Sequence, residues 1–346
     1  MEEPATSMLR SVNDPLRPGV NSSGERVLSI EGLRVEFRLP DESTEVLCGV
    51  DLTARPGEIV GVVGESGSGK TVAALAVVGL LPSAAHVSGG SVRFFNENLL
   101  DLDSRQMRAI RGSRISMIFQ NPRASLNPVF TVGRMLREVL LVHSGLRGRK
   151  ATVRAQELLA DVGLPDPSAV MRRYPHQLSG GMAQRAMIAL ALSSSPDLLL
   201  ADEPTTALDV TIQHQIIQLL LRLRKRQNLT QIVITHNFGV VAELCDRVAV
   251  MYAGAILEEA PVGRIFEAPG HPYTRGLLSA RARVEQSSGI RSIPGQVPEL
   301  KNRPTGCSFH PRCEHARDIC RVSTPRLESS APNHSIACHR WRELAQ

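Results

Sequence analysis

A glycine-rich segment constrains this chain more than any other feature of its sequence. The residues GESGSGKT, which end in Lys70 and Thr71, fit the pattern G-x-x-x-x-G-K-[ST] in full. They follow the apolar run 58–63, which is typical of a buried parallel strand, and precede a predicted helix over 71–81. Glycines let such a loop curl so that backbone N–H groups converge on phosphate oxygens, and the helix start adds its positive dipole end. The sequence therefore predicts a site for a nucleoside triphosphate.

The side chains of this loop have separate expected roles. Lys70 is expected to neutralise charge on the β- and γ-phosphates, and Thr71 to place its hydroxyl on Mg²⁺. A chance Gly/Ser loop that caps a helix is the plain alternative, which the full match between a strand and a helix disfavours. The predicted nucleotide contacts are Gly64, Ser66, Gly67, Ser68, Gly69, Lys70 and Thr71.

A second apolar run, over 197–201, ends in two acidic residues. Asp202 is expected to reach the Mg²⁺ shell, and Glu203 to polarise the attacking water as a general base. An apolar strand that ends in Asp-Glu is common by chance. It becomes informative here because it lies downstream of a phosphate-binding loop.

Strands and helices alternate along most of the chain. The length of 346 residues allows one large or two unequal domains. The alternation predicts an α/β fold with a mostly parallel sheet and a helical insertion. Residues 1–26 lack periodicity and are expected to form a flexible tail, and the Pro- and Gly-rich sequence after Gly263 indicates a small appended domain. Strands are expected at 27–30, 33–37 and 232–235, and helices at 104–111, 132–144, 150–162 and 212–226.

The composition excludes several classes of protein. Hydrophobic residues make up 42% and charged residues 21%, which is ordinary for a globular chain. The net charge of +6 is spread over scattered arginines, and aromatic residues amount to 3%, so no nucleic-acid partner is expected. The apolar run 72–81 is far shorter than the roughly 20 residues that span a bilayer. Residues 1–26 are polar where a secretory signal is apolar, which predicts a cytoplasmic location.

A further segment connects the chain to a family. The segment Leu178-Ser179-Gly180-Gly181 opens a predicted helix just before the Asp-Glu strand. By itself it is a capped helix start, whose N–H groups can also meet a phosphate. In this position it resembles the signature of the ATP-binding cassette (ABC) ATPases. The resemblance implies that two nucleotide-binding domains sandwich ATP, with the phosphate loop of one domain facing Ser179, Gly180 and Gly181 of the other. Met182 departs from the glutamine most common there.

The other landmarks of that family occur in the family's order. Gln120 matches the Q-loop glutamine, which the resemblance assigns to sensing Mg²⁺ and water and to contacting the membrane partner. Asp209 matches the D-loop at the dimer interface, and His236 the switch histidine that contacts the γ-phosphate. Phe37 stands where an aromatic residue stacks on adenine. The implied fold is a P-loop NTPase domain over 27–264, with an antiparallel β subdomain and a helical subdomain at about 112–177.

The cysteines gather near the end of the chain. Of six cysteines, Cys48 and Cys245 stand alone, and the others follow the spacing C-x5-C-x6-C-x17-C. Such thiolates can hold Zn²⁺ or an iron–sulfur cluster. The gaps between these cysteines are wider than in the close Cys pairs of structural zinc sites, which fits a cubane iron–sulfur cluster somewhat better. The plain alternative is a tail of free thiols. The predicted ligands are Cys307, Cys313, Cys320 and Cys338.

The C-terminal sequence narrows the resemblance. The run His271-Pro272-Tyr273-Thr274, followed by Pro311-Arg312-Cys313, is similar to the extension of dipeptide, oligopeptide and nickel importer ATPases. The Met182 variant of the signature is similar to the same group. The resemblance implies a C-terminal extension over 265–346, in which the four cysteines hold a [4Fe–4S] cluster, with Zn²⁺ as the alternative.

This resemblance implies an ATP- and Mg²⁺-dependent ATPase subunit that energises peptide import at the cytoplasmic face of the plasma membrane. The implied partners are a related second ATPase, two transmembrane permease subunits and, indirectly, an extracytoplasmic substrate-binding protein. Nickel, opines, glutathione and antimicrobial peptides are alternative solutes. The alternative function from another class of protein is a soluble ABC ATPase acting on ribosomes or DNA. A redox or iron sensor that gates transport is the alternative role for the cysteines.

Overall fold

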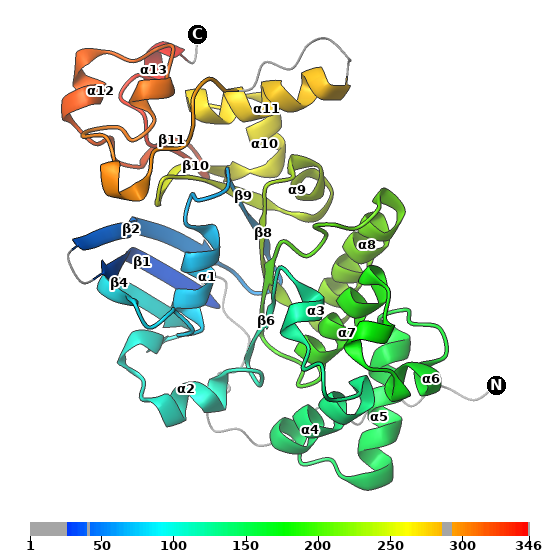
Figure 1. Ribbon diagram of the computed structural model, residues 1–346. Coiled ribbons are helices and arrows are strands. Elements are labelled where there is room, and N and C mark those ends of the chain that lie inside the picture. Colours follow the sequence, from blue (N-terminus) through cyan, green and yellow to red (C-terminus); the bar gives the residue numbers. More distant parts are fainter. Residues whose placement is uncertain (1–25, 40–41, 286–292, 345–346) are drawn as a thin grey trace.

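The computed structural model describes residues 26–39, 42–285 and 293–344, which form two β-sheets with flanking helices (Figure 1). The expected N-terminal tail therefore lies outside the described residues, apart from Arg26. The strands are β1 (Leu28–Leu39), β2 (Glu42–Ala54), β3 (Ile59–Val63), β4 (Ala85–Phe94), β5 (Glu97–Asn98), β6 (Ile115–Ile118), β7 (Leu198–Asp202), β8 (Thr230–Thr235), β9 (Arg247–Tyr252), β10 (Ala255–Pro261), β11 (Glu328–Ala331) and β12 (His334–Ile336).

Helices connect these strands and cover the main sheet. The α-helices are α1 (Lys70–Val77), α2 (Ser104–Ile110), α3 (Pro122–Ser125), α4 (Val132–Ser144), α5 (Gly148–Asp161), α6 (Pro167–Arg172), α7 (Gly180–Leu192), α8 (Val210–Gln227), α9 (Phe238–Leu244), α10 (Val262–Glu267), α11 (Pro272–Glu285), α12 (Asp318–Val322) and α13 (Trp341–Leu344). Short 3₁₀ helices are η1 (Leu99–Asp101), η2 (Pro175–Gln177), η3 (Leu300–Asn302) and η4 (His310–Arg312).

The main sheet has the strand order β11-β12-β10-β9-β3-β8-β7-β6. Its centre is parallel, because β3 pairs in parallel with β8 and β9, and β7 pairs in parallel with β6 and β8. The carboxyl ends of β3, β8, β7 and β6 therefore lie side by side at one edge. In open α/β sheets, ligands bind at this edge.

Alternate residues of the central strands face two different cores. Ile59 and Val63 of β3 pack in a core with helices α7, α8 and α9, whereas Val60 and Val62 pack with α1 and the second sheet. Every residue of β3 is buried, as the continuous apolar run predicts for a strand covered on both faces. The predicted α/β class with a mostly parallel sheet is confirmed.

The second sheet is antiparallel, with the order β2-β1-β4-β5 (Figure 1). The sequence pattern predicts separate strands at 27–30 and 33–37, but the structure has the single strand β1. The pairing register with β2 shifts between Ile30 and Leu33, and Gly32 has a φ of 59°, so an irregularity breaks the alternation without ending the strand. This sheet is the antiparallel subdomain that the family resemblance implies.

Helix α1 is shorter than the apolar pattern predicts. The pattern extends to residue 81, but the helix ends at Val77. Gly79 follows with a φ of 60°, and the backbone N–H of Leu80 donates back to the carbonyl of Leu75 at 2.9 Å. This glycine-based C-cap stops the helix before Pro82.

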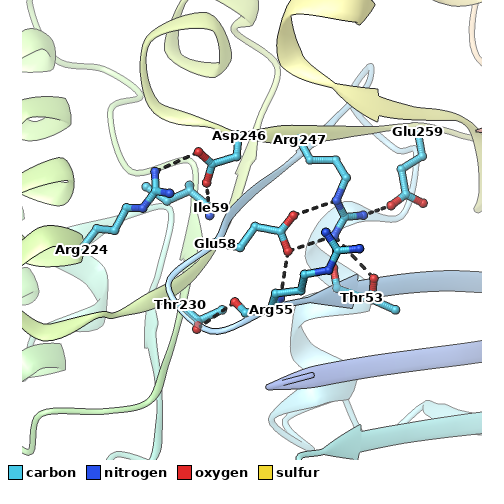
Figure 2. Close-up of polar contacts among 9 residues, drawn as sticks. All are labelled: Thr53, Arg55, Glu58, Ile59, Arg224, Thr230, Asp246, Arg247 and Glu259. Atoms are coloured by element: carbon cyan, nitrogen blue, oxygen red, sulfur yellow. Dashed lines mark hydrogen bonds and ion pairs between the residues drawn. The ribbon is translucent and has the colours of Figure 1, made fainter. Parts of the chain in front are cut away.

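A polar cluster joins the two sheets where β9 begins (Figure 2). Arg247 donates through Nε to Glu58 Oε1 at 2.9 Å and forms a second ion pair with Glu259. Next to it, Asp246 accepts a hydrogen bond from Arg224 of α8 at 2.9 Å. Because Glu58 immediately precedes β3, these pairs fix the start of the strand that leads into the glycine-rich loop.

The C-terminal extension joins the main sheet instead of standing apart from it. Strand β12 pairs with β10 through Glu258 and Ile336, and β11 completes the sheet edge. Glu258 is fully buried and accepts hydrogen bonds from the backbone N–H groups of Gly270 and His271 at 2.6 and 2.9 Å. Its Oε1 also lies 2.8 Å from Nε2 of His334. Burial raises the pKa of Glu258, but these hydrogen-bond partners lower the pKa by a larger amount. The pKa of Glu258 in the folded protein is therefore below its usual value.

Candidate nucleotide-binding site

The glycine-rich loop lies between β3 and α1, as the motif predicts. Gly64, Gly67 and Gly69 all have positive φ angles. At Gly64 a side chain is excluded, because a Cβ atom there would lie 2.1 Å from the carbonyl oxygen of Met251. The loop is thus held against the end of β9, in a conformation that requires glycine.

Lys70 folds back onto this loop. Its Nζ donates to the carbonyl oxygens of Gly64 at 2.9 Å and Glu65 at 2.8 Å, and to Ser68 Oγ at 3.2 Å. Burial lowers the pKa of Lys70, against the opposing effect of Glu203, Asp202 and Glu65. The ammonium group is therefore held by oxygens of the loop itself.

Thr71, in the first turn of α1, contacts Asp202, the last residue of β7. Thr71 Oγ1 donates to Asp202 Oδ2 at 2.9 Å. The other carboxylate oxygen, Oδ1, is buried without a hydrogen-bond partner. Burial raises the pKa of Asp202 overall, although the Thr71 hydroxyl lowers it. A buried carboxylate oxygen without a donor, beside a hydroxyl, suits a divalent cation, so these residues fit Mg²⁺.

Glu203 and His236 also lie together. Glu203 follows β7 with a φ of 49°, and its Oε1 lies 2.7 Å from His236 Nδ1, at the end of β8. Its Oε2 accepts hydrogen bonds from Thr206 at 2.6 Å and Thr235 at 3.4 Å. The Glu203 side chain is 10% exposed and the His236 side chain 60% exposed. The carboxylate is thus fixed, and the imidazole faces open space.

The remaining predicted residues lie around this edge or beyond it. Gln120 is exposed and follows β6, the strand next to β7. Phe37 is half-buried in β1 of the antiparallel sheet, opposite Thr44 and Ala85. The signature and D-loop residues lie elsewhere, at the starts of α7 and α8.

The signature and the D-loop share one cavity. Ser179 is the N-cap of α7, and its Oγ accepts a hydrogen bond from the backbone N–H of Met182 at 3.3 Å. Asp209 caps α8 in the same way, with Ile212 N as donor at 2.9 Å. A cavity of about 470 Å³ is lined by these caps together with Gly180 and Gly181. Both helix N-termini thus open onto a space that a phosphate can reach.

The four late cysteines line another cavity, in the C-terminal extension. Cys307 and Cys320 are buried, and Cys313 and Cys338 are partly buried. Burial raises the pKa of Cys307 to about 11, with smaller effects from the other cysteines. Within the described ranges, no three His, Cys, Asp or Glu side chains are arranged to hold a single metal ion. The metal- or cluster-binding domain predicted from the spacing is therefore not shown by the structure.

Sequence reasoning missed several residues of the site. Thr206 and Thr235 bind Glu203, and Tyr273 and Arg312 of the extension reach the glycine-rich loop. Tyr273 and Arg312 belong to segments that the sequence singles out, next to His271-Pro272 and Cys313. Their contact with the loop has no signal in the sequence, because it depends on how the extension packs.

Comparisons with known proteins agree with this geometry. Residues 47–206 match the ABC transporter family, and residues 257–320 match the oligopeptide/dipeptide transporter C-terminal region. Among solved structures, the dimeric ATP-binding cassette MJ0796 bound to ADP and Pi is 29% identical, covers 68% of this chain and 98% of its own, and has a TM-score of 0.62. CbiO1 from Clostridium perfringens, at 25% identity, covers 76% of this chain and 96% of its own, with a TM-score of 0.61.

Curated relatives extend over almost the whole chain. The probable peptide ABC transporter ATP-binding protein y4tR of Sinorhizobium fredii is 47% identical and covers 95% of this chain and 99% of its own length. The dipeptide transport ATP-binding protein DppD of Escherichia coli is 44% identical, over 90% and 96%. The oligopeptide transport ATP-binding protein OppD of Salmonella typhimurium is 45% identical, over 91% and 93%.

The fold and the site define a P-loop ATPase of the cassette type, and the chain belongs to the ABC transporter family. It carries in addition the C-terminal region of oligopeptide/dipeptide transporters. The predicted ATPase activity is confirmed at this level, and ATP with Mg²⁺ is its substrate. Across the described part of the chain, no helix is both long and apolar enough to cross a bilayer.

Proposed function

We propose that this chain is the ATP-hydrolysing subunit of an importer for dipeptides or oligopeptides, bound peripherally at the cytoplasmic face of the membrane. The observation that carries the proposal is the extent of the similarity: relatives named for dipeptide and oligopeptide transport align over nine-tenths of the chain, C-terminal extension included. Two permease subunits would form the channel, and a substrate-binding protein would deliver the peptide outside. No nucleic acid is needed.

The contacts at the sheet edge support the following proposed catalytic roles. Glu203 takes the proton of the attacking water, and His236 holds Glu203 and reaches the γ-phosphate. Lys70 turns from the loop carbonyls to the phosphates. Thr71 and Asp202 would hold Mg²⁺, which would supply positive charge against the phosphates. The loop backbone and its Ser66 and Ser68 bind phosphate, Gln120 senses the metal and water, and Phe37 stacks on adenine.

A second ATPase subunit completes the site. The cavity at Ser179, Gly180, Gly181 and Asp209 lies at the starts of α7 and α8, away from this chain's own glycine-rich loop. In a head-to-tail dimer, these helix N-termini would face ATP bound to the partner. We propose that the partner is a related but different chain, so that the pair is a heterodimer.

An apolar depression beside the Q-loop supports a permease contact. A cavity of about 280 Å³ lies between β6, α3 and α4, and its lining includes Phe119, Leu126 and Val139. Leu80, which also lines this cavity, is 45% exposed. A mostly apolar hollow with an exposed apolar side chain in its lining fits a short helix of a membrane subunit. Because Gln120 adjoins this hollow, movement of the permease would be felt at the metal site.

We propose further that the cysteine cavity holds a [4Fe–4S] cluster, with Zn²⁺ as the alternative. The four thiols come from separated segments yet line one enclosed, mostly apolar space. Ligands spread around a cavity suit a cubane, which is touched from several directions, better than one ion. Anaerobic purification followed by iron, sulfide and zinc analysis tests this. Iron and sulfide in equal amounts support the cluster, and stoichiometric zinc without iron refutes it.

Uptake measurements test the importer proposal. A strain carrying Lys70→Ala should lose uptake of labelled di- and oligopeptides, while the exposed lysine variant Lys150→Ala should transport normally. Uptake of nickel, opines, glutathione and antimicrobial peptides is measured in parallel. If the Lys70→Ala strain loses uptake of one of these solutes and keeps peptide uptake, that solute and not a peptide is the transported substrate. A protein that purifies with ribosomes or DNA and without permease subunits would overturn the importer reading.

A further inference from the structure

Arg312 of the C-terminal extension is fully engaged at the glycine-rich loop. Its Nη1 and Nη2 form a two-point ion pair with Glu65, at 2.6 Å to Oε2 and 3.1 Å to Oε1. Its remaining N–H groups donate to Tyr252 Oη at 3.3 Å and to the carbonyls of Ile293 at 3.3 Å and Pro294 at 2.9 Å. The guanidinium thus has an acceptor for each of its five N–H donors. The Arg312 side chain is 6% exposed, so the planar, fork-shaped guanidinium group is held rigidly.

Glu65, the partner of this fork, is the second residue of the phosphate-binding motif. Its carbonyl oxygen accepts the hydrogen bond from Lys70 Nζ, and its backbone N–H donates to Tyr273 Oη at 3.0 Å. Tyr273 is fully buried. The side chain and the backbone N–H of Glu65 are therefore fixed by residues outside the cassette motifs.

The same contacts connect the loop to the cysteine cavity. Tyr252, Tyr273 and Phe309 pack edge to face or tilted, with ring centroids 4.6 to 5.3 Å apart. Phe309 lines the cysteine cavity, and Arg312 precedes Cys313. The loop, the aromatic cluster and the extension thus form one packed unit.

The negative charge of Glu65 connects the Arg312 contact with ATP binding. The carboxylate lies close enough to Lys70 to affect its pKa and, with Arg312 removed, would be an unpaired negative charge beside the triphosphate. An unpaired anion there repels phosphate, and a loop without its anchor must be ordered when ATP binds.

We propose that Arg312 is a positioning residue for ATP binding, which holds and neutralises Glu65 so that the glycine-rich loop is ready for phosphate. The C-terminal extension is then part of the nucleotide site. The proposal rests on ATP binding alone, and peptide import can fail its own test without affecting it.

The test uses the full chain for the Kd of a non-hydrolysable Mg-ATP analogue, and the full chain assembled with the second ATPase subunit for KM and kcat of ATP hydrolysis. Arg312→Gln should raise Kd and KM about fivefold or more, in the range of site-to-site coupling, and leave kcat within about twofold. Arg312→Lys keeps the charge without the fork and should give an intermediate Kd. Wild-type Kd in a folded Arg312→Gln protein would overturn the proposal.

Two further variants separate positioning from general loosening of the extension. Arg275 bonds to carbonyls of Pro269 and Leu344, within the extension, so Arg275→Gln should bind the analogue normally. An equal loss of affinity in Arg275→Gln would count against a specific role of Arg312. Glu65→Gln combined with Arg312→Gln should bind no worse than Arg312→Gln alone, because the pair acts as a unit. Additive losses would contradict the proposal. If Arg312→Gln fails to fold, Arg312→Lys decides in its place.

Discussion

The Nδ1 atom of His236 lies 2.7 Å from Oε1 of Glu203, and this contact joins the ends of two neighbouring strands at the nucleotide edge. The carboxylate is nearly buried and receives a second set of hydrogen bonds from threonines. The histidine thus holds the side chain that is proposed to activate water, and its own ring faces the open side.

Replacing Glu203 by Gln should stop turnover without preventing ATP binding. The amide keeps the size of the side chain but cannot take a proton from water, so kcat should fall by about 100-fold or more. ATP should then trap the closed dimer with the second ATPase subunit, which gel filtration of the two subunits together, with and without ATP, detects. Glu243→Gln is the control, because Glu243 pairs with His214 on the surface. Undiminished turnover in Glu203→Gln would contradict its role as the base.

Thr71→Val should raise the Mg²⁺ concentration that the ATPase needs. The substitution keeps the shape but removes the hydroxyl that donates to Asp202, a hydrogen bond to a carboxylate. Such bonds contribute about 1.5–3 kcal/mol, so kcat/KM at limiting Mg²⁺ should fall by roughly tenfold or more. A Mg²⁺ titration of steady-state hydrolysis measures this. Thr152 is half-buried in α5 and its hydroxyl donates to the Gly148 carbonyl, away from the metal site. Thr152→Val should therefore show an unshifted titration, whereas an unshifted titration in Thr71→Val would exclude Thr71 from the metal site.

Gly64→Ala should destabilise the protein and abolish nucleotide binding. The added Cβ would lie 2.1 Å from a backbone oxygen, at a φ of 156°, so the loop must move away from β9. We expect the unfolding temperature to fall by roughly 5 °C or more. Gly263→Ala is the control, since a Cβ there meets nothing within 4 Å. Thermal unfolding with and without ATP compares the two, and equal behaviour would mean that the close approach at Gly64 is unimportant.

Glu58 should contribute stability that disappears in acid. Burial raises the pKa of Glu58, but the hydrogen bond and charge of Arg247 lower the pKa by a larger amount. The folded-state pKa therefore lies below the usual 4.5. A carboxyl group with a depressed pKa stabilises the fold above its unfolded pKa and loses that contribution as pH falls through the folded pKa. Glu58→Gln should therefore cost roughly 3 kcal/mol at about pH 7, as expected for a broken buried pair, and progressively less as the pH falls below 4.5.

Urea unfolding of both proteins across this pH range measures the difference in free energy. Arg34 pairs with the more exposed Glu45, so Glu45→Gln should show a much smaller change. A gap between Glu58→Gln and the unchanged protein that stays constant with pH would show that ionisation of Glu58 is not its source.

Local sequence pattern was enough to predict the glycine-rich loop, the strand before it, two central strands later in the chain and much of the helical content. The pattern at 132–144 matches α4, and the apolar runs at 197–201 and 232–235 match β7 and β8 within a few residues. These features depend on short-range periodicity and on motif spacing, which the chain carries in its own order. Where a glycine interrupts the periodicity, as at Gly32 and Gly79, the predicted limits of strands and helices were wrong.

The sequence by itself determined the chemistry of the nucleotide edge, because phosphate binding needs glycines, a lysine, a hydroxyl and carboxylates in one short set of motifs. Only the tertiary structure decided how distant residues share that edge. Parallel pairing of β7 and β8 brings Glu203 against His236, and packing of the extension brings Arg312 to Glu65, 247 positions away. Contacts between residues so far apart depend on the pairing and packing of whole elements, which no local pattern records.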